Sequence, residues 1–387
     1  MKHDRRKSVR LLALAAMVIG AAFLLMECTP EGAWDIVIRE LQPDPWQEPD
    51  QKYRMRLAFD NEEGTEDLDD FPLLVVLNSS RVDYSEFQAG GADIRFYDED
   101  TGLQLDHEVE YWDTSGESIV WVKVPRIRAG TQFDYIWMYY GDSTAGDTQD
   151  PGGLWSDYRL VYHFSDDPGN TVYDSTANGN DGTSEIDGAA GAPLLVSARV
   201  GLGLQCTSAP SKRYVDTDYR EDLGNWTIEA WIKADEAPFL NAAGGFANGP
   251  LMGGQVYNIG WDHNGDTYLG AIQVRDSVTS WQAVKLGTLE GGTWYHLAGV
   301  YDSSAPSITA YNNGEPVGDP FTNLSGTLSA TAYDVYIGVE NNENNPVDGI
   351  VDEVRISALV RSDEYIKAQY RSMTDSFIVY YDPEEVD

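Results

Sequence analysis

Hydrophobic and polar residues alternate along most of the chain after residue 50. In Tyr53–Phe59 every second residue, starting with the tyrosine, is apolar or aromatic, which places these side chains on one face of an extended segment. Similar patterns predict strands at residues 71–77, 93–97, 108–112, 119–124 and 133–140. Asp- and Gly-rich turns separate these segments, and none has the period of a helix. The pattern therefore predicts a small antiparallel β-sandwich over residues 51–150.

The same alternation continues over residues 153–382. In Thr227–Lys233 the side chains of Ile228, Ala230 and Ile232 share one face. Hairpin turns are predicted at Asn313-Gly314 and between residues 257–261 and 267–274. A single short helix is predicted after residue 362, a serine that can cap it and is followed by two acidic residues. Residues 377–381 predict a last strand. So long a run of strands favours one large two-sheet sandwich.

The first 50 residues have the pattern of a targeting segment and a linker. Residues 1–28 contain a basic start and then an apolar run from Leu11 to Met26, which is short for a membrane span and suits a secretory signal. Cys28 follows, in a context that resembles the bacterial lipoprotein signal; Leu25 fits that signal, whereas Glu27 departs from it. Lipidation of Cys28, an uncleaved anchor and ordinary cleavage stay open. Residues 29–50 are acidic, contain four prolines and predict a linker.

Charge limits the partners that this chain can have. There are 26 basic and 64 acidic residues, which gives a formal net charge of −38. Such a surface repels nucleic acid and anionic lipid, so membrane contact is expected only through the amino-terminal anchor. The protein is expected to be exported, and either held at the cell envelope or secreted. Two cysteines, Cys28 and Cys206, are too few for a zinc framework or a disulfide scaffold.

Two family resemblances become specific at the predicted strands. Residues 93–98, 108–110, 121–125 and 139–142 resemble, in order, a bacterial domain of unknown function, number 2341. Five segments of the second region resemble the laminin-G-like, concanavalin A-like jelly-roll family: 162–164, 174–182, 226–232, 294–302 and 349–356. The first resemblance implies a fold and an extracellular context but no activity. Together they imply an all-β protein: a small antiparallel sandwich, then a larger jelly-roll sandwich with one short helix near the carboxyl end.

The second resemblance implies a calcium ion. In the pattern of residues 350–356, Asp352 falls on the face of the isoleucine and valine side chains, where a carboxylate is costly unless it is paired or metal-bound. In the laminin-G-like family the matching Asp and a loop that begins at Asp174 often share calcium. The resemblance thus implies Asp174, Asn178 and Asp352 as ligands of a structural ion. Two alternatives stay open: Asp352 accepts backbone N–H groups, and Asp174 closes an Asx turn.

The chain carries no catalytic motif that we recognise. His-Glu-x-x-His, Gly-x-Ser-x-Gly and P-loop patterns are absent from the sequence, and the nearest approach to a glucanase Glu-x-Asp-x-Glu motif, Glu185-Ile186-Asp187, lacks a third acid. His296 lies in a strand of family-typical sequence and is expected to be a sheet residue. Asp93 and Arg95 can be a ligand pair, but we favour a structural brace. The sequence therefore favours a protein that is not an enzyme.

Aromatic residues suggest what such a protein binds. The chain has 11 Trp and 23 Tyr residues, and sugar rings pack on aromatic faces beside polar hydroxyl partners. The candidates near loops are Tyr257, Trp261, Asp262, Tyr268 and Trp281; the alternative is that they fill the sandwich core. We predict a non-catalytic cell-surface protein that binds glycans or envelope polymers. The alternatives are an adhesion spacer that binds protein and, less favoured, a glycan-degrading enzyme.

Overall fold

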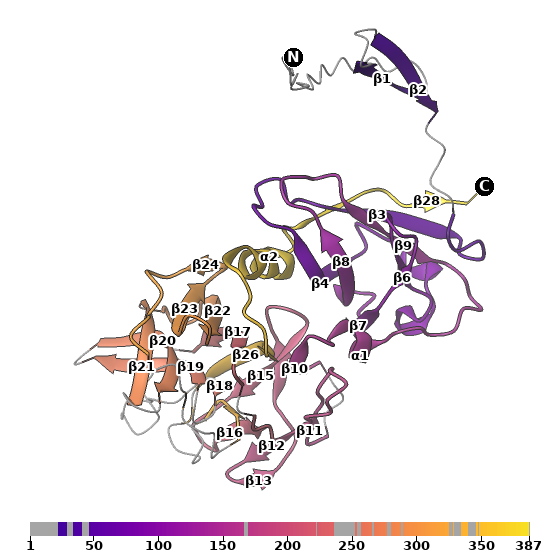
Figure 1. Ribbon diagram of the computed structural model, residues 1–387. Helices are drawn as coiled ribbons and strands as arrows, with labels where there is room; N and C mark the ends of the chain where they lie inside the picture. Colours follow the sequence, from indigo (N-terminus) through magenta and orange to yellow (C-terminus); the bar gives the residue numbers. More distant parts are fainter. Residues whose placement is uncertain are drawn as a thin grey trace, which may run out of the picture. The chain divides into compact units, whose positions relative to one another are not determined.

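The computed structural model describes residues 22–28, 34–40, 46–165, 169–221, 223–235, 252–253, 257–264, 267–276, 280–287, 289–324, 328, 334–339, 346 and 348–386. The chain divides into two compact units, Met1–Pro49 and Asp50–Asp387. The second unit holds two sandwiches (Figure 1). Its described helices are α1 (Pro151–Leu154) and α2 (Asp363–Met373), with 3₁₀ turns at Tyr84–Glu86 and Ala89–Gly91.

The first sandwich packs a six-stranded sheet on a three-stranded one. The larger sheet has the order β27-β3-β9-β5-β6, with β28 also on β3, and the smaller has the order β4-β8-β7. Met55, Leu57 and Phe59 of β3 lie in the core between them, as their alternation predicts. The bounds are β3 (Tyr53–Phe59), β4 (Leu68–Leu77), β5 (Arg95–Asp98), β6 (Gln104–Leu105), β7 (His107–Tyr111), β8 (Ser118–Ile127), β9 (Tyr135–Tyr140), β27 (Ile378–Tyr380) and β28 (Glu384–Glu385).

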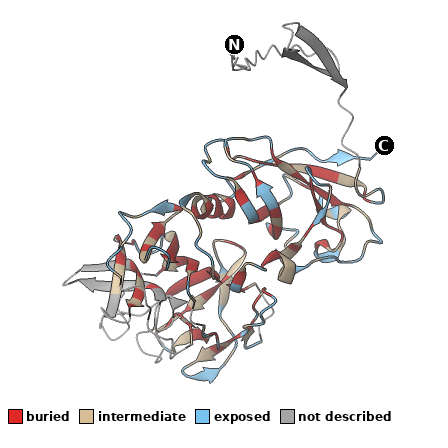
Figure 2. Ribbon diagram, viewed as in Figure 1, coloured by how far each residue is buried: buried red, intermediate tan, exposed pale blue. Residues whose placement is uncertain are grey.

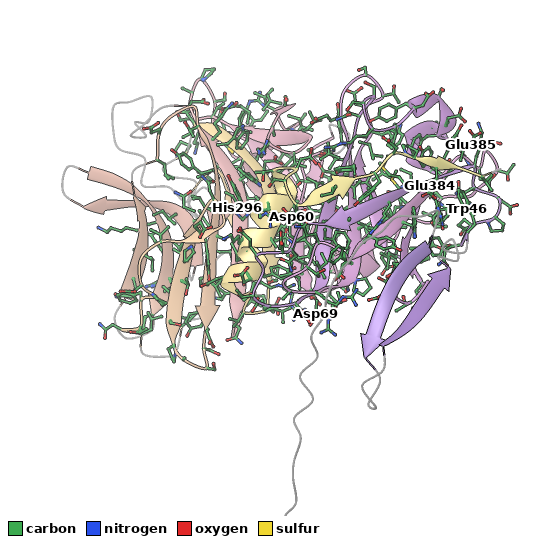
Figure 3. The ribbon with its side chains drawn as sticks, turned by 90° about the horizontal axis from the view of Figure 1, so that it is seen from above. Trp46, Asp60, Asp69, His296, Glu384 and Glu385 are labelled. Carbon is green, nitrogen blue, oxygen red and sulfur yellow. The ribbon has the colours of Figure 1, made fainter. Side chains whose placement is uncertain are left out.

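The carboxyl-terminal strands return to this first sandwich. The sequence assigns the strand near residue 380 to the second sandwich, through residue 382, but β27 pairs antiparallel with β3, at Ile378–Phe59 and Tyr380–Leu57. Glu384 of β28 also lies on β3 and forms an ion pair with Arg54 at 2.8 Å. Figure 3 labels Glu384 and Glu385 on this last strand. The strand order could not be predicted from the sequence, because alternation indicates that a segment is a strand but not which strand it pairs with.

The second sandwich is the larger, with sheets β14-β15-β26-β17-β22-β23-β24 (β10 also on β26) and β11-β12-β16-β25-β18-β19-β20-β21 (β13 on β12). The bounds are β10 (Tyr158–Tyr162), β11 (Thr171–Val172), β12 (Gly182–Ile186), β13 (Ala189–Ala190), β14 (Leu195–Ser197), β15 (Leu202–Cys206), β16 (Arg213–Asp216), β17 (Trp226–Ala234), β18 (Met252–Gly253), β19 (Tyr257–Asn264), β20 (Thr267–Asp276), β21 (Ser280–Gly287), β22 (Trp294–Asp302), β23 (Ser307–Asn312), β24 (Glu315–Pro316), β25 (Tyr336–Ile337) and β26 (Gly349–Ser357).

The core of this sandwich confirms the predicted faces. Ile228, Ala230 and Ile232 of β17 are buried between the two sheets, and Figure 2 shows buried residues along these strands. The hairpin expected after residue 261 is confirmed, since Asn264 pairs with Thr267. The all-β class with few helices is therefore the observed architecture.

Helix α2 is buried on two sides. Ser362 caps it by accepting a hydrogen bond from the Tyr365 N–H at 3.1 Å, as predicted. Tyr365 and Ala368 pack into the core of the first sandwich. Ile366 packs instead on Ala298, Val300 and Tyr311 of the second sandwich. Because successive residues of a helix point to different sides, one helix joins the two sandwiches.

The amino-terminal unit contains one described hairpin. Strand β1 (Ala22–Cys28) pairs antiparallel with β2 (Trp34–Glu40). The linker over residues 29–50 stays a prediction, and β2 lies within it at residues 34–40, where hydrophobic residues recur at alternate positions. Residues 1–21 and the side chain of Cys28 lie outside the described residues. Within the described part of the chain, no helix is both long and apolar enough to span a bilayer.

Candidate functional site

A β-bulge in β26 turns charged residues toward the first sandwich. Glu353 has φ = +51°, and the β17 pairing shifts by one residue, so that Glu229 faces Arg355 but Trp231 faces Asp352. The extra residue changes which side chains share a face. Val351, Val354 and Ile356 enter the sandwich core, whereas Asp352, Glu353 and Arg355 are buried outside it.

This overturns the predicted placement of Asp352 among the apolar side chains of the core. Simple alternation put Asp352 on the same face as Val354, and the bulge separates the two. Asp352 Oδ2 accepts a hydrogen bond from the Val200 N–H at 2.8 Å, the backbone alternative that the sequence left open. Its Oδ1 is buried, and no hydrogen-bond partner is described for it.

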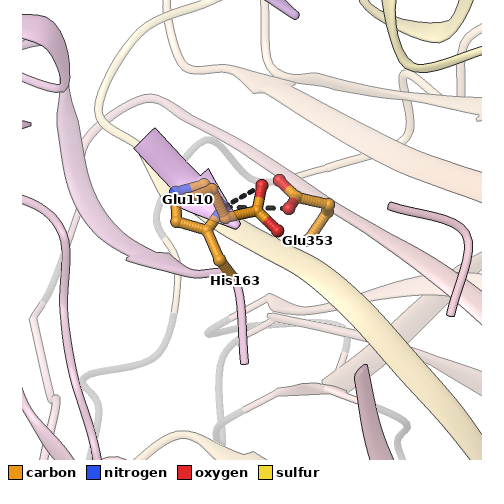
Figure 4. Close-up of side chains that lie close together, drawn as sticks. All are labelled: Glu110, His163 and Glu353. Atoms are coloured by element: carbon orange, nitrogen blue, oxygen red, sulfur yellow. Dashed lines mark hydrogen bonds and ion pairs between the residues drawn. The ribbon is translucent and has the colours of Figure 1, made fainter. Parts of the chain in front are cut away.

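His163 lies beside the carboxyl groups of Glu110 and Glu353, at the centre of a layer of buried charged residues (Figure 4). Its Nδ1 is 2.8 Å from Glu353 Oε1 and 3.6 Å from Glu110 Oε2, and its Nε2 is 3.5 Å from Glu108 Oε2. Both ring nitrogens thus face carboxylates, an arrangement that suits a doubly protonated imidazolium. The histidine follows β10 of the second sandwich, while Glu108 and Glu110 belong to β7 of the first.

Aromatic and hydroxyl donors hold the two β7 carboxylates. Trp121 Nε1 donates to Glu110 at 2.7 Å, and Trp155 Nε1 donates to Glu108 at 2.6 Å. Ser165 and Ser175 each add a hydroxyl donor at 2.8 Å, to Glu110 and Glu108 respectively. Each glutamate thus receives donors from outside its own strand, which fixes both carboxylates at the junction of the sandwiches.

Arg355 completes the layer. Its guanidinium forms an ion pair with Glu353 and donates to Gln369 of α2 at 2.9 Å. It also lies over the rings of Trp121 and Trp155, at 4.3 and 4.9 Å from their centroids. The arginine thereby contacts both sandwiches and the helix that joins them.

Burial and neighbouring charges shift the pKa values of this group in opposite directions. Burial opposes a charge on His163, but Glu353, Glu110 and Glu108 raise its pKa well above the ordinary value. Burial, reinforced by Glu353, raises the pKa of Glu110 to about 8. Burial also disfavours charge on Glu353, yet His163 and Arg355 lower its pKa to about 2. Burial, with Glu353 nearby, raises the pKa of Asp352 well above its usual range.

We call this buried group between the sandwiches the ionic lock. It comprises Glu108, Glu110, His163, Asp352, Glu353 and Arg355. One atom each of Glu110, His163 and Glu353 lies within 4.8 Å of the others, a spacing that a metal ion could use. However, Glu353 already accepts from His163 and pairs with Arg355, whose charge opposes a cation. The side chains of Glu110 and Glu353 are 1% and 0% exposed, so no substrate reaches them in this structure.

A cleft of about 360 Å³ lies beside the lock, where the sandwiches meet. We call it the junction cleft. Its apolar lining includes Leu74, Val76 and Ile119 of the first sandwich, together with Val200 and Met373, and these five belong to one buried cluster. Its polar lining comprises Tyr111, Asp113, Glu117, Ser197, Arg199, Thr374 and Asp375. The cleft therefore combines an apolar floor with donors and acceptors from both sandwiches.

The lock supports one wall of this cleft. Val200, which lines the cleft, donates its N–H to Asp352. Gly201, the next residue, has φ = +51°, and a side chain there would stand 2.9 Å from Glu110 Oε1. The loop that follows β14 thus rests directly on the ionic lock, and its shape is coupled to it.

The predicted calcium ligands are only partly brought together. Asp174 Oδ1 accepts from the N–H groups of Val161 and Thr176, which makes the Asx turn left open above, and Oδ2 accepts from Thr176 Oγ1 and the Asn180 N–H. Asn178 Nδ2 donates to backbone carbonyls of the same region. Asp352 instead contacts Val200. The described contacts satisfy Asp174 within its loop and do not unite the three residues as one ligand set.

The other predicted residues divide into two groups. Asp93 accepts from the Gln88 and Gly141 N–H groups, and Arg95 donates to backbone carbonyls, so both brace turns. His296 is a buried sheet residue 3.2 Å from Glu229; it lies beside α2 (Figure 3). The side chains of the predicted aromatic site lie outside the described residues, although their backbones belong to β19, β20 and β21: Tyr257, Trp261, Asp262, Tyr268 and Trp281.

Sequence reasoning missed both the lock and the cleft. One usable signal was Glu108-Val109-Glu110, which places two carboxylates on one face of a strand that belongs to a sandwich. A second was His163, directly after a strand of otherwise apolar and aromatic residues. Neither signal identifies its partner, because the partners come from the other sandwich.

Two family comparisons match parts of the chain in the predicted order. Residues 90–180 match the model of a domain of unknown function (DUF2341), and residues 210–367 match the model of the concanavalin A-like lectin/glucanases superfamily. The first match covers β5 to β9 of the first sandwich and continues past His163 into the second, so its boundary crosses the junction. The search of curated proteins finds no match.

Two solved structures match about half of the chain. Domain 4 of AbnA, a GH43 extracellular arabinanase from Geobacillus stearothermophilus in complex with arabinotriose, is 16% identical with a TM-score of 0.42, covering 55% of this chain and 97% of that one. The binding domain of Paraclostridial Mosquitocidal Protein 1 is 12% identical with a TM-score of 0.43, covering 56% of this chain and 52% of that one.

Proposed function

We propose that this chain, which carries a concanavalin A-like lectin/glucanase-type domain after a domain of unknown function, is a non-catalytic carbohydrate-binding protein of the cell surface. The observation that carries the proposal is the junction cleft, whose volume of about 360 Å³ falls in the range of small-ligand sites. Its apolar floor suits the C–H face of a sugar ring, and its polar rim offers partners to hydroxyl groups.

The state of the acidic residues favours binding over hydrolysis. A glycosidase needs two carboxyl groups on either side of a bond that substrate and water can reach. The paired carboxylates of the lock are buried and engaged with His163, Arg355 and tryptophan N–H groups. In the cleft itself, Asp375 is held by two hydrogen bonds from Arg81.

The pattern of residues 1–28 supports export, and Cys28 is the proposed lipid attachment point. An anchor of that kind would keep the sandwiches at the cell envelope, where glycans and other polymers are the available ligands. Ordinary cleavage would release the same domains as a secreted protein. Mass spectrometry of the protein from membrane and medium fractions distinguishes the two.

The direct test is a glycan-array screen of residues 29–387 in calcium-containing buffer, followed by calorimetry on any glycan that binds. Ser197 is exposed on the cleft lining, so Ser197→Trp fills the cleft without disturbing the core. We expect this variant to lose binding. The matched control, Ser304→Trp, adds the same bulk at an exposed turn outside the cleft lining and should bind normally.

Two outcomes contradict the proposal. If the folded protein binds no glycan, a structural spacer with protein partners becomes the better account, and pull-down from envelope extracts is the next experiment. If binding survives Ser197→Trp but is lost with Trp261→Ala or Trp281→Ala, the protein recognises sugars on the second sandwich and not at the junction.

A further inference from the structure

We infer that Arg199 makes the junction cleft selective for glycans that carry a carboxylate group, such as uronic or sialic acid residues. This inference rests on the proposed function, because it assigns the ligand class of the same cleft. It requires an arginine that is available, held at the cleft and not cancelled by the acidic residues around it.

Arg199 is available to a ligand. It lies in the loop between β14 and β15, lines the cleft and is half-buried. Within the described part of the chain it has no carboxylate partner, although acidic residues outnumber basic ones by more than two to one. Three other arginines at this junction are all paired: Arg81 with Asp375, Arg355 with Glu353, and Arg361 with Asp157.

An aromatic ring lies beside the guanidinium of Arg199. The Arg199 Cζ atom lies 5.2 Å from the centroid of the Trp231 ring. That ring is itself held, since Trp231 Nε1 donates to Met373 Sδ at 3.1 Å and the ring stacks on Tyr370 at 5.6 Å. The N–H donors of a guanidinium match both oxygens of a carboxylate, and no carboxylate is described as a partner of those of Arg199.

One of the three acidic residues that line the cleft, Asp375, is paired with an arginine. Asp375 accepts two hydrogen bonds from Arg81 and one from Tyr380. Asp113 accepts from the hydroxyl and N–H of Ser115 in its own turn, which lowers its pKa. Glu117 is exposed, and no ion pair is described for it. An acidic ligand at Arg199 would therefore meet two carboxylates for which no ion pair is described, Asp113 and Glu117, and salt screens both because neither is buried.

Substitution of Glu117 tests the inference, because the direction of the change in affinity depends on the charge of the ligand. If the ligand carries a carboxylate, Glu117→Gln removes a repulsion and binding tightens by about twofold to fivefold. If the ligand is neutral and Glu117 accepts one of its hydroxyl groups, the same substitution weakens binding.

The experiment is calorimetry of the full chain with oligosaccharides that contain galacturonate, glucuronate, mannuronate or sialate, each beside its methyl ester, which keeps the sugar and removes the charge. We expect the free acids to bind at least tenfold more tightly than the esters. Arg199→Gln should abolish that difference. Arg199→Lys should keep only part of it, because lysine retains the charge but cannot donate two parallel hydrogen bonds to a carboxylate.

The outcomes separate this inference from the proposed function. Equal binding of acid and ester by the native protein overturns it without any variant, so a folding defect in Arg199→Gln cannot hide the answer. Tight binding of neutral glycans that Arg199→Gln leaves unchanged would refute the carboxylate assignment while the proposed function stands. Failure of every glycan, acidic or neutral, refutes both.

Discussion

His163 is the residue on which the charge balance of the junction depends. It stands between carboxylates of both sandwiches, and its pKa is raised by all three of them. Buried ion pairs often contribute little net stability compared with an apolar replacement, but removing one member leaves its partners charged and unpaired. The contribution of His163 to stability therefore depends on the cost of leaving its carboxylate partners buried without a counter-ion.

We expect His163→Gln to lower the free energy of unfolding by about 3–5 kcal/mol, because Glu353 and Glu108 lose a buried counter-ion. Chemical denaturation at pH 6.5 measures this. Lys367→Gln is the control, since the Lys367–Glu315 pair at 3.2 Å is largely exposed and contributes at most about 1 kcal/mol. A similar small effect for both variants would mean that the lock contributes nothing measurable.

Stability should fall as pH rises from about 4.5 to about 8. The folded pKa of Glu110 is raised to about 8, so the folded state holds a proton that the unfolded state loses near pH 4.5, and stability decreases between these values. The raised pKa of His163 acts in the same direction at higher pH. Melting temperatures from pH 5 to 9 should therefore decline, and Glu110→Gln should flatten the decline. Glu117→Gln, at an exposed position, should not alter it.

At the scale of elements, the bulge in β26 decides which side chains meet. Without the extra residue at Glu353, Asp352 would lie in the sandwich core, and the lock would lose its alignment with β7. The cleft wall depends on a similar detail, because Gly201 takes a left-handed conformation against Glu110.

Gly201→Ala tests the coupling between lock and cleft. The new Cβ would stand 2.9 Å from Glu110 Oε1 and share the strain of a positive φ. Gly130→Ala is the matched control, with φ = +67° and open space around the Cβ. We expect Gly201→Ala to be more destabilising than the control by about 1 kcal/mol or more, measured by denaturation. Equal losses would show that backbone strain alone is responsible.

Calcium shared by Asp174, Asn178 and Asp352 stays a prediction, and melting can test it. The reason to expect an ion is the resemblance, together with the buried Asp352 Oδ1 that lacks a described partner. Calcium at about a hundredfold above its Kd should then add roughly 2.7 kcal/mol, and Asp352→Asn should remove the gain. Melting unaffected by calcium or chelator would mean that hydrogen bonds alone close the loop of Asp174.

The sequence predicted the elements better than their associations. Strands such as Tyr53–Phe59 and the capped helix after Ser362 follow from local periodicity and capping. The bulge at Glu353 was not predictable, because one added residue leaves the hydrophobic count of a strand unchanged. The cleft was not predictable either, since it is built from residues far apart in the chain, such as Leu74, Arg199 and Met373.

At the scale of the molecule, the two sandwiches are not independent domains joined by a linker. Helix α2 packs into both, and β27 and β28 extend the first sheet although they follow the second sandwich in sequence. The ionic lock adds polar contacts between them. We therefore describe Asp50–Asp387 as one compact unit, in agreement with the division of the chain.

This arrangement predicts one cooperative unfolding transition for residues 46–387 in calorimetry. A fragment of residues 46–150 should fail to fold stably, because it lacks Tyr365, Ala368 and Phe377 of its own core and the strands that cover β3. Adding a synthetic peptide of residues 360–386 is the control, and it should restore part of the structure seen by circular dichroism. A fragment that melts cooperatively on its own would contradict this.

The place of β27 has a consequence for how the protein is made. The outer neighbour of β3 lies more than 300 residues further along the chain, as the pairing of Glu384 with Arg54 shows. While the chain emerges from the ribosome, the first sandwich cannot close before nearly everything else has been synthesised. A chain that stays open for so long remains threadable, and a narrow export channel accepts only threadable chains. If the protein is exported as proposed, late closure lets the first sandwich fold after transport.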